Sequence, residues 1–220
     1  MTIEQNVRYL QNRIARACQR TGRSPDKVTL VAVTKTVDAA AIEAAFNAGI
    51  REFGESRVQE VRPKIEQLHK FEPGITWHFI GHLQTNKAKT AAQIFDIIHS
   101  IDSLKLAETL NNCSQKKLPV LIQVNVSAEA TKSGFPLSEV NEAVRQIGRL
   151  SNLEVQGLMT IAPWVSDAEE VRPIFRQLRQ VRDALGLRHL SMGMSDDFEV
   201  AIEEGATLIR IGRAVFGERS

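Results

Sequence analysis

The strongest constraint on the fold is a regular alternation of strand and helix patterns along the 220 residues. Short uncharged runs rich in β-branched residues alternate with longer segments whose apolar residues recur every three or four positions. The first pattern is typical of buried strands, and the second of amphipathic helices. The predicted strands span residues 28–34, 50–54, 77–80, 94–99, 118–125, 153–159, 189–191 and 207–211. The predicted helices span residues 2–20, 38–48, 56–70, a segment from about 86, 103–114, 137–150, 168–185 and 197–204.

This alternation predicts an α/β protein, with a single (β/α)8 barrel of the TIM type. The helix over residues 2–20 precedes the first strand, so it is extra to the barrel, and Thr2 is a candidate for its N-cap. A doubly wound open sheet is the alternative. No linker or low-complexity segment interrupts the pattern, so we expect one domain over residues 1–220. In such barrels the functional groups lie at the carboxyl ends of the strands.

Composition and charge argue against several classes of partner. The chain is 43% hydrophobic and 25% charged, with a formal net charge of +2, which gives no reason to expect nucleic acid or a membrane surface as partner. No apolar run reaches the roughly 18 residues of a membrane span, and no secretory signal is visible. Cys18 and Cys113 stand apart without metal or redox spacing. We therefore expect a cytoplasmic protein without a metal site.

One lysine stands where the first strand must end. Val31, Val33 and Lys35 share a face because side chains alternate along a strand, and a helix pattern begins three residues later. Burial at a strand end favours the uncharged form of an amine, which is the form that attacks an aldehyde. The alternative is that Lys35 reaches past the strand end into solvent. The residues alone leave both interpretations open.

A second group of candidates follows the last two strands. Arg210 and Gly212 share a face of the strand over 207–211, and Gly212 and Arg213 open a turn with unpaired backbone amides. Ser195, after the preceding strand, offers a hydroxyl just before a helix. TIM barrels often bind phosphate at these two loops. The alternatives are that Ser195 only caps the helix and that Gly212 only permits the turn.

The remaining polar residues near the strands are less informative. His78, His82 and His99 could belong to the core or to a pocket, and their spacing does not suggest a metal site. Glu52 and Glu55 could pair with arginines or act as acids. The sequence contains no nucleophile–base signature and no P-loop.

Seven motifs occur in an order that is specific to one family, and together they cover nearly the whole chain. They are Val-Ala-Val-Thr-Lys (31–35), Phe-Gly-Glu-Ser-Arg-Val-Gln-Glu (53–60), Trp-His-Phe-Ile-Gly-His-Leu-Gln-Thr-Asn-Lys (77–87), Lys-Ser-Gly (132–134), Gly-Leu-Met-Thr (157–160), Leu-Ser-Met-Gly-Met-Ser-Asp-Asp (190–197) and Arg-Ile-Gly-Arg-Ala-Val-Phe-Gly (210–217). The chain resembles the pyridoxal phosphate homeostasis protein family, single-domain relatives of the alanine racemase barrel.

The resemblance implies a cofactor and a site. Pyridoxal 5'-phosphate would be held as an internal aldimine on Lys35, with Arg210 facing the pyridine nitrogen. Ser195 and the backbone of Gly212 and Arg213 would hold the phosphate. The family is regarded as regulatory, with an effect on amino-acid and keto-acid balance and no established catalysis. The resemblance therefore implies a monomer that is not an enzyme, with apo forms of pyridoxal phosphate-dependent enzymes as possible recipients.

One departure from the family pattern lies next to the second strand. The family usually has Gly-Glu-Asn where this chain has Gly54-Glu55-Ser56. Serine is shorter than asparagine and has one polar atom, so a pocket contact made by that amide is in doubt here.

Two rival functions belong to other classes. One is a small amino-acid racemase, and the other is an aldolase that forms a Schiff base with a sugar phosphate and needs no bound cofactor. The colour of the purified protein distinguishes them: a yellow protein supports the cofactor-binding readings, and a colourless protein supports the aldolase.

Overall fold

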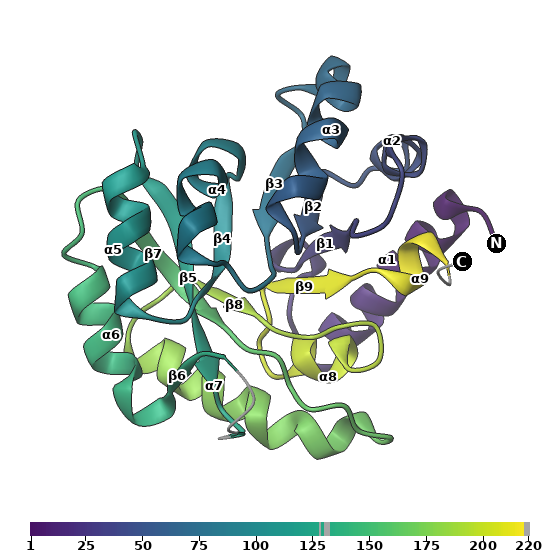
Figure 1. Ribbon diagram of the computed structural model, residues 1–220. Helices are drawn as coiled ribbons and strands as arrows, with labels where there is room; N and C mark the ends of the chain where they lie inside the picture. The colour runs from purple at the N-terminus through teal and green to yellow at the C-terminus, as the bar shows by residue number, and fades with distance from the viewer. Residues whose placement is uncertain (128, 130–132, 218–220) are drawn as a thin grey trace.

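The computed structural model describes residues 1–127, 129 and 133–217 (Figure 1). Lys132, which belongs to the Lys-Ser-Gly motif, lies outside the described residues. The strands are β1 (Thr29–Val33), β2 (Glu52–Glu55), β3 (Thr76–Phe79), β4 (Ile97–Ile101), β5 (Leu118–Asn125), β6 (Phe135–Pro136), β7 (Leu153–Met159), β8 (His189–Ser191) and β9 (Leu208–Ile211). The helices are α1 (Ile3–Arg20), α2 (Ala39–Asn47), α3 (Val58–Leu68), α4 (Ala88–Ile94), α5 (Leu104–Cys113), α6 (Val140–Ile147), α7 (Arg172–Ala184), α8 (Phe198–Glu203) and α9 (Arg213–Phe216).

Eight of the strands form a closed parallel barrel, which confirms the predicted (β/α)8 fold. The hydrogen-bonded order is β4-β3-β2-β1-β9-β8-β7-β5, and β5 pairs back onto β4 to close the ring. The register is continuous around β1, where Val31 lies opposite both Glu52 of β2 and Arg210 of β9. The two-residue strand β6 pairs only with the end of β5 and stands outside the ring.

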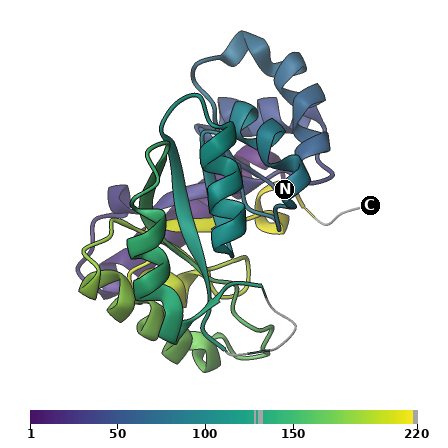
Figure 2. The same cartoon turned by 60° about the vertical axis from the view of Figure 1, so that its left-hand side comes forward.

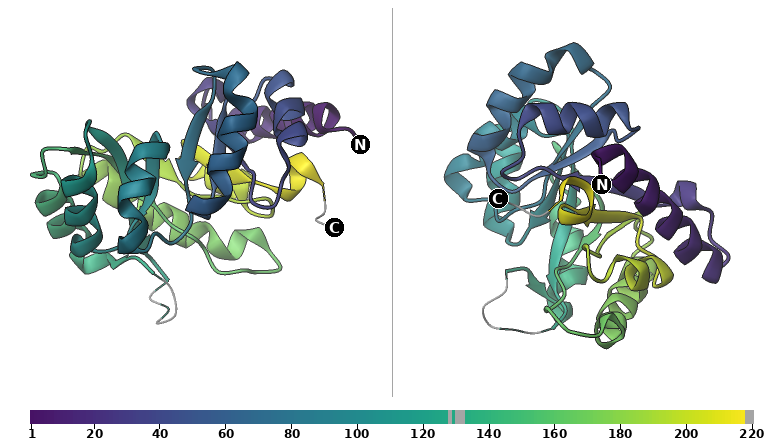
Figure 3. Two further views of the ribbon diagram at one scale, coloured as in Figure 1. Left: turned by 45° about the horizontal axis from the view of Figure 1, so that its top comes forward. Right: turned by 90° about the vertical axis from the view of Figure 1, so that its right-hand side faces the viewer.

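The helices cover the outside of the barrel. Helices α4, α5 and α6 lie side by side along one flank (Figure 2). The extra helix α1 packs against α8, α9 and α2, so the two ends of the described chain are close together (Figure 3). The predicted cap at Thr2 is confirmed, because its side chain accepts a hydrogen bond from the Gln5 amide in a capping box. Asn6 Nδ2 donates to the carbonyl of Val215 at 3.0 Å and ties α1 to α9.

The apolar core has two parts, as expected for a barrel with outer helices. The larger part fills the layer between strands and helices, and it includes the fully buried Cys18 on α1. The smaller part forms inside the barrel from strand residues that point inward: Val31, Ile97, Leu121, Met159 and Leu208. This apolar layer leaves the remaining interior positions to polar side chains.

Several predicted boundaries were wrong. The fourth strand begins at Ile97 rather than residue 94, because Ile94 ends α4 and the Phe95 amide still bonds to the Ala91 carbonyl at 3.0 Å. Asp96 then pins the strand start, since its side chain accepts from the Trp77 amide at 2.8 Å. The helices predicted over 137–150 and 168–185 open with 3-10 turns, at Leu137–Glu139 and Ala168–Val171. The predicted helix over 137–150 ends early, at Ile147.

The prediction missed two short elements. It missed β6, and it took the segment after Gly212 for a turn where the four-residue helix α9 begins at Arg213.

Candidate functional site

Lys35 lies in a turn directly after β1, at the carboxyl-terminal rim of the barrel. The strand ends at Val33, and the side chain of Lys35 is half-buried. The next residue, Thr36, has φ of 63°, a left-handed conformation that is strained for a β-branched residue. The prediction that Lys35 stands at the rim is confirmed.

A buried polar cluster supports this turn from outside the barrel. Thr34 Oγ1 donates to Glu55 Oε1 at 2.7 Å, and Lys64 Nζ donates to the Thr34 carbonyl at 2.7 Å. Lys64 also forms an ion pair with the fully buried Glu55. The backbone immediately before Lys35 is therefore held by a lysine whose charge is compensated locally. The other oxygen, Glu55 Oε2, has no hydrogen-bond partner among the described residues. Glu55 thus pairs with a lysine and not with an arginine.

Arg210 is buried inside the barrel, with only 4% of its surface exposed. Its Nη1 donates to Ser191 Oγ at 2.6 Å, and its Nη2 donates to the Thr160 carbonyl at 2.8 Å. Burial lowers the pKa of Arg210 to about 10, and nearby Asp197 acts in the opposite direction. The guanidinium therefore stays charged at neutral pH and is fixed in orientation by two acceptors.

Ser195 lies in the loop between β8 and α8, which a glycine shapes. Gly193 has φ of +93°, and a Cβ there would lie 2.6 Å from the Cβ of Ala201, so a larger residue would displace the loop. The interpretation of Ser195 as a helix cap is wrong, because Asp197 occupies the N-cap position of α8. Within the described part of the chain, the hydroxyl of Ser195 makes no hydrogen bond. It is half-buried and available to a ligand.

Gly212 and Arg213 start the short helix α9 at the end of β9. The amides of Val215 and Phe216 both donate to the Gly212 carbonyl, so the amides of Arg213 and Ala214 have no acceptor within the helix. The exposed Arg213 side chain pairs with Asp196 at 2.8 Å. That ion pair links the loop after β8 to the loop after β9.

The predicted site residues come from three consecutive strands of the barrel. Lys35 follows β1, Arg210 lies in β9 with Gly212 and Arg213 after it, and Ser195 follows β8. These strands are neighbours in the order β1-β9-β8, and adjacent parallel strands lie about 4.8 Å apart. One side of the barrel mouth therefore presents an amine, a buried guanidinium, a free hydroxyl and two open amides.

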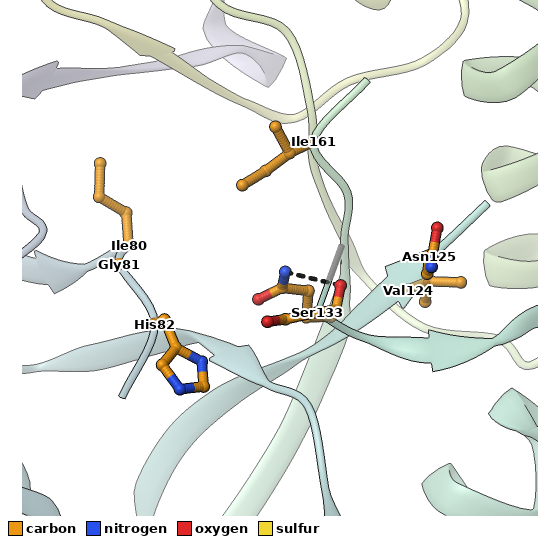
Figure 4. Close-up of a pocket in the computed structure, with 8 residues that line it drawn as sticks. Ile80, Gly81, His82, Val124, Asn125, Ser133 and Ile161 are labelled. Carbon is orange, nitrogen blue, oxygen red and sulfur yellow. Dashed lines mark hydrogen bonds between the residues drawn. The ribbon is translucent and has the colours of Figure 1, made fainter. Parts of the chain in front are cut away.

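A hollow of about 190 Å³ opens at the ends of β3, β5 and β7 (Figure 4). Ile80, His82 and Ile161 surround it, and Gln123 Nε2 donates to the Ser133 carbonyl at 3.0 Å in its wall. His82 is exposed and pairs with Asp102 at 3.0 Å. None of the five predicted site residues is among the described residues that line this hollow.

A second hollow, of about 300 Å³, adjoins the Ser195 loop. Met194, Asp196 and Asp197 of that loop line it, together with the exposed Trp164. The barrel mouth thus has open space beside the phosphate-loop candidates.

A set of polar residues whose place the sequence left open lies in the barrel interior. Glu52, His78 and His99 point inward and bond to one another and to Ser191, below Arg210. His78 stands between the outward-facing Trp77 and Phe79 on β3, and this alternation is the signal that could have identified it. Only the register between β2, β3 and β4 shows that Glu52, His78 and His99 lie next to one another. Glu52 thus pairs with a histidine and not with an arginine, and among the described residues no group of His, Cys, Asp and Glu is arranged to hold a metal ion.

The sequence matches the family described as alanine racemase, N-terminal domain, over residues 3–220. It is 45% identical over 216 residues to a pyridoxal phosphate homeostasis protein of Aquifex aeolicus, with 94% of each chain covered. It is 42% identical over 226 residues to the protein of that name from Escherichia coli, with 99% of this chain and 97% of the other covered. The chain belongs to the pyridoxal phosphate homeostasis protein family. The resemblance seen in the seven motifs is thereby confirmed.

Solved structures agree with this assignment. PipY of Synechococcus elongatus, a structure described as having PLP bound, matches with a TM-score of 0.81 and 38% identity, covering 93% of this chain and all of that one. An unknown protein from Bifidobacterium adolescentis matches with a TM-score of 0.91 and 39% identity, covering 97% of this chain and 94% of that one. Alanine racemase of Corynebacterium glutamicum, at 17% identity and a TM-score of 0.70, shares the fold. No helix in the described segments is long and apolar enough to cross a membrane.

Proposed function

We propose that this protein binds pyridoxal 5'-phosphate as a Schiff base on Lys35 and takes part in cofactor homeostasis and in amino-acid and keto-acid balance, without catalysis. The observation that carries the proposal is the arrangement on β1, β9 and β8, which places Lys35, Arg210 and Ser195 at one side of the barrel mouth. Homeostasis proteins over 40% identical and PipY, solved with PLP bound, support it.

The residues present fit the chemistry of this ligand. The ligand supplies an aldehyde that condenses with amines, and the Lys35 amine condenses with it and releases one water. The amides of Gly212, the N-cap of α9, and of Arg213 donate no backbone hydrogen bond among the described residues, so with the free hydroxyl of Ser195 they are donors suited to a phosphate. Arg210 is charged and can only donate hydrogen bonds, so it would donate to a ring nitrogen that carries no hydrogen.

The biological role follows from what such a site does to a reactive aldehyde. Holding it on one lysine keeps it from other amines, and the reaction is reversible. We propose that a cytoplasmic monomer over residues 1–220 buffers the ligand and that apo forms of pyridoxal phosphate-dependent enzymes receive it. Mixing loaded protein with an apo-enzyme, with and without a trap for free aldehyde, distinguishes direct transfer from release.

The experiment that tests the site compares two ligands by absorbance titration. Charge-assisted bonds to the phosphate contribute about 1.5–3 kcal/mol each, so pyridoxal without phosphate is expected to bind far more weakly than pyridoxal phosphate. Lys35→Ala is expected to lose the Schiff-base absorbance and keep weak binding. Lys87→Ala serves as the matched control, because Lys87 lies between β3 and α4, in the 3-10 turn Thr85–Lys87 on the carboxyl-terminal side of β3. Equal affinities for the two ligands would contradict the phosphate site, and full absorbance in Lys35→Ala would contradict the lysine.

A further inference from the structure

A continuous line of hydrogen bonds crosses the interior of the barrel from Glu52 to Arg210. Glu52 Oε2 lies 2.6 Å from His78 Nε2, and His78 Nδ1 lies 2.8 Å from His99 Nε2. His99 Nδ1 lies 2.8 Å from Ser191 Oγ, which accepts from Arg210 Nη1 at 2.6 Å. Because β4, which carries His99, and β8, which carries Ser191, are not neighbours, the line spans the lumen.

The donors in this line can be assigned from its two ends. A guanidinium can only donate, so Ser191 Oγ accepts from Arg210, and a carboxylate can only accept, so Glu52 accepts from His78 Nε2. With a neutral ring at His78, its Nδ1 accepts from His99 Nε2, and with a neutral ring at His99, its Nδ1 accepts the single hydrogen of Ser191 Oγ. All four bonds point the same way, from a buried cation toward a carboxylate, so each bond polarises the next.

Burial supports a neutral imidazole at His99, in the middle of the line. His78 and His99 are both buried, with 3% and 0% of their surfaces exposed. Burial lowers the pKa of His99 well below its usual range, and the basic groups of His78, Arg210 and His189 around it lower it further. Arg210 is thus the cation at one end of the line, and Glu52, whose side chain is 29% exposed at the start of β2, is the carboxylate at the other end.

We propose that Ser191, His99, His78 and Glu52 form a one-directional relay that positions Arg210 for the ring nitrogen of pyridoxal phosphate. This inference rests on the proposed function for Arg210. Two of the five guanidinium N–H groups are committed to Ser191 and to the Thr160 carbonyl, which leaves the other donors to the cofactor. The relay couples the cofactor pocket to a carboxylate at the amino-terminal end of β2, and its members act through Arg210 as positioning residues.

The first test needs no cofactor. The chain contains five histidines, so imidazole nitrogen NMR of the full-length protein resolves them with single-site variants for assignment. His78 and His99 are expected to be neutral Nε2–H tautomers at neutral pH, with and without pyridoxal phosphate. A Nδ1–H tautomer or a doubly protonated ring at His78 or His99 would overturn the relay.

The second test measures the effect on the cofactor. Ser191→Ala removes the acceptor for Arg210, and Glu52→Gln removes the terminal charge while keeping an acceptor for His78. Both are expected to shift the absorption maximum of the bound cofactor in the same direction and to raise its Kd by roughly three- to tenfold. His189→Gln is the matched control, because His189 is an interior histidine on β8 that bonds Thr207 at 3.2 Å outside the line.

The outcomes separate this inference from the function on which it rests. A wild-type protein that binds the cofactor, with Ser191→Ala unchanged in maximum and Kd, would overturn the relay and leave the proposed function intact. A wild-type protein that gives no cofactor absorbance would overturn the proposed function and the cofactor role of the relay, while the tautomers would still decide whether the hydrogen-bonded line exists.

Discussion

The backbone before Lys35 depends on a single buried ion pair. Lys64 bonds both the Thr34 carbonyl and Glu55, and neither Lys64 nor Glu55 is more than 12% exposed in its side chain. Thr36 is held in its left-handed conformation just beyond this cluster. The cluster therefore offsets backbone strain at the position from which the reactive amine projects.

Removing Lys64 is expected to be strongly destabilising. Lys64→Met leaves the Glu55 carboxylate buried without a cation, which costs about 3–5 kcal/mol in the free energy of unfolding, measured in urea. Lys70→Met is the control, because its pair with Glu43 is exposed, at 54% and 38%. A double change of Lys64→Met with Glu55→Leu is expected to recover much of the loss. A small loss in Lys64→Met would show that the pair does not hold the turn.

Ser56 is expected to tolerate the residue that is usual in the family. The backbone of Ser56 is packed against Gly81, where a Cβ would lie 2.2 Å from the Ser56 carbonyl oxygen, but its side chain is only half-buried, so a longer side chain can reach solvent. Ser56→Asn should change the affinity for pyridoxal phosphate by about 1 kcal/mol at most, as measured by absorbance titration. A large loss of affinity would indicate a pocket rebuilt around serine.

A residue could be predicted from the sequence where the pattern that marks it lies within one segment of the chain. The position of Lys35 at the rim was predictable because it directly follows the uncharged run of its strand, whereas the role of Arg210 came only from the family resemblance. The line through Glu52, His78 and His99 was not predictable, because it depends on the register of three strands and on contact across the lumen. The ion pair of Lys64 with Glu55 likewise joins a helix face to a strand end that no local pattern connects.

Among the elements, helix α8 carries a network of ion pairs that holds α1 and α7 against the barrel. Glu199 bonds Arg13 of α1 at 2.7 Å, and Glu203 bonds Arg172 of α7 at 2.6 Å. Glu204, at the end of α8, is 4% exposed in its side chain and faces three arginines of α7. The extra helix predicted from residues 2–20 is therefore fixed by charge as well as by its apolar stripe.

This network predicts a loss of stability in acid. Burial raises the pKa of Glu204, but the bonds from Arg176 and Arg172 outweigh it, so the pKa lies below its ordinary value. The unfolded chain then binds the proton more readily, so the stabilisation is present above about pH 4.3 and is lost as the pH falls through the folded pKa. Glu204→Gln should lower the free energy of unfolding by about 1–3 kcal/mol at neutral pH. It should also weaken the fall of this free energy with falling pH, as measured by urea unfolding.

The matched control for Glu204 is Glu43→Gln, which removes an exposed pair with Lys70. It should leave the free energy of unfolding and its dependence on acidic pH nearly unchanged. If the free energy of unfolding falls equally steeply with pH in Glu204→Gln and in the unchanged protein, Glu204 is not the source of the acid sensitivity.

Elements with strong periodicity were predictable, and short or ambiguous ones were not. The strands over 118–125, 153–159 and 189–191 match β5, β7 and β8 residue for residue, because apolar runs bounded by polar turns define them. The apolar run from residue 94 was divided between a helix end and a strand, which propensity alone does not separate. The two-residue β6 exists only through its pairing with β5.

For the whole molecule, the arrangement of acid–base groups predicts no useful racemase activity. A two-base racemase needs a proton donor or acceptor on each face of its substrate, and Lys35 serves one face. Tyr9 is the only tyrosine in the sequence, and its side chain lies on α1, 54% exposed and beside Arg13. We therefore expect no sustained deuterium exchange at the α-carbon of common amino acids. Exchange with enzyme-like turnover, lost in both Lys35→Ala and Tyr9→Phe, would make this protein an enzyme.

The central claim is the covalent attachment of pyridoxal phosphate to Lys35 at the rim of the barrel, and one measurement tests it most directly. Borohydride reduction of the loaded full-length protein, followed by peptide mass spectrometry, locates the pyridoxyl group. We expect one reduced adduct, on Lys35, which disappears in Lys35→Ala and persists in Lys87→Ala. An adduct on Lys64, Lys87 or Lys132 in place of Lys35 would contradict it.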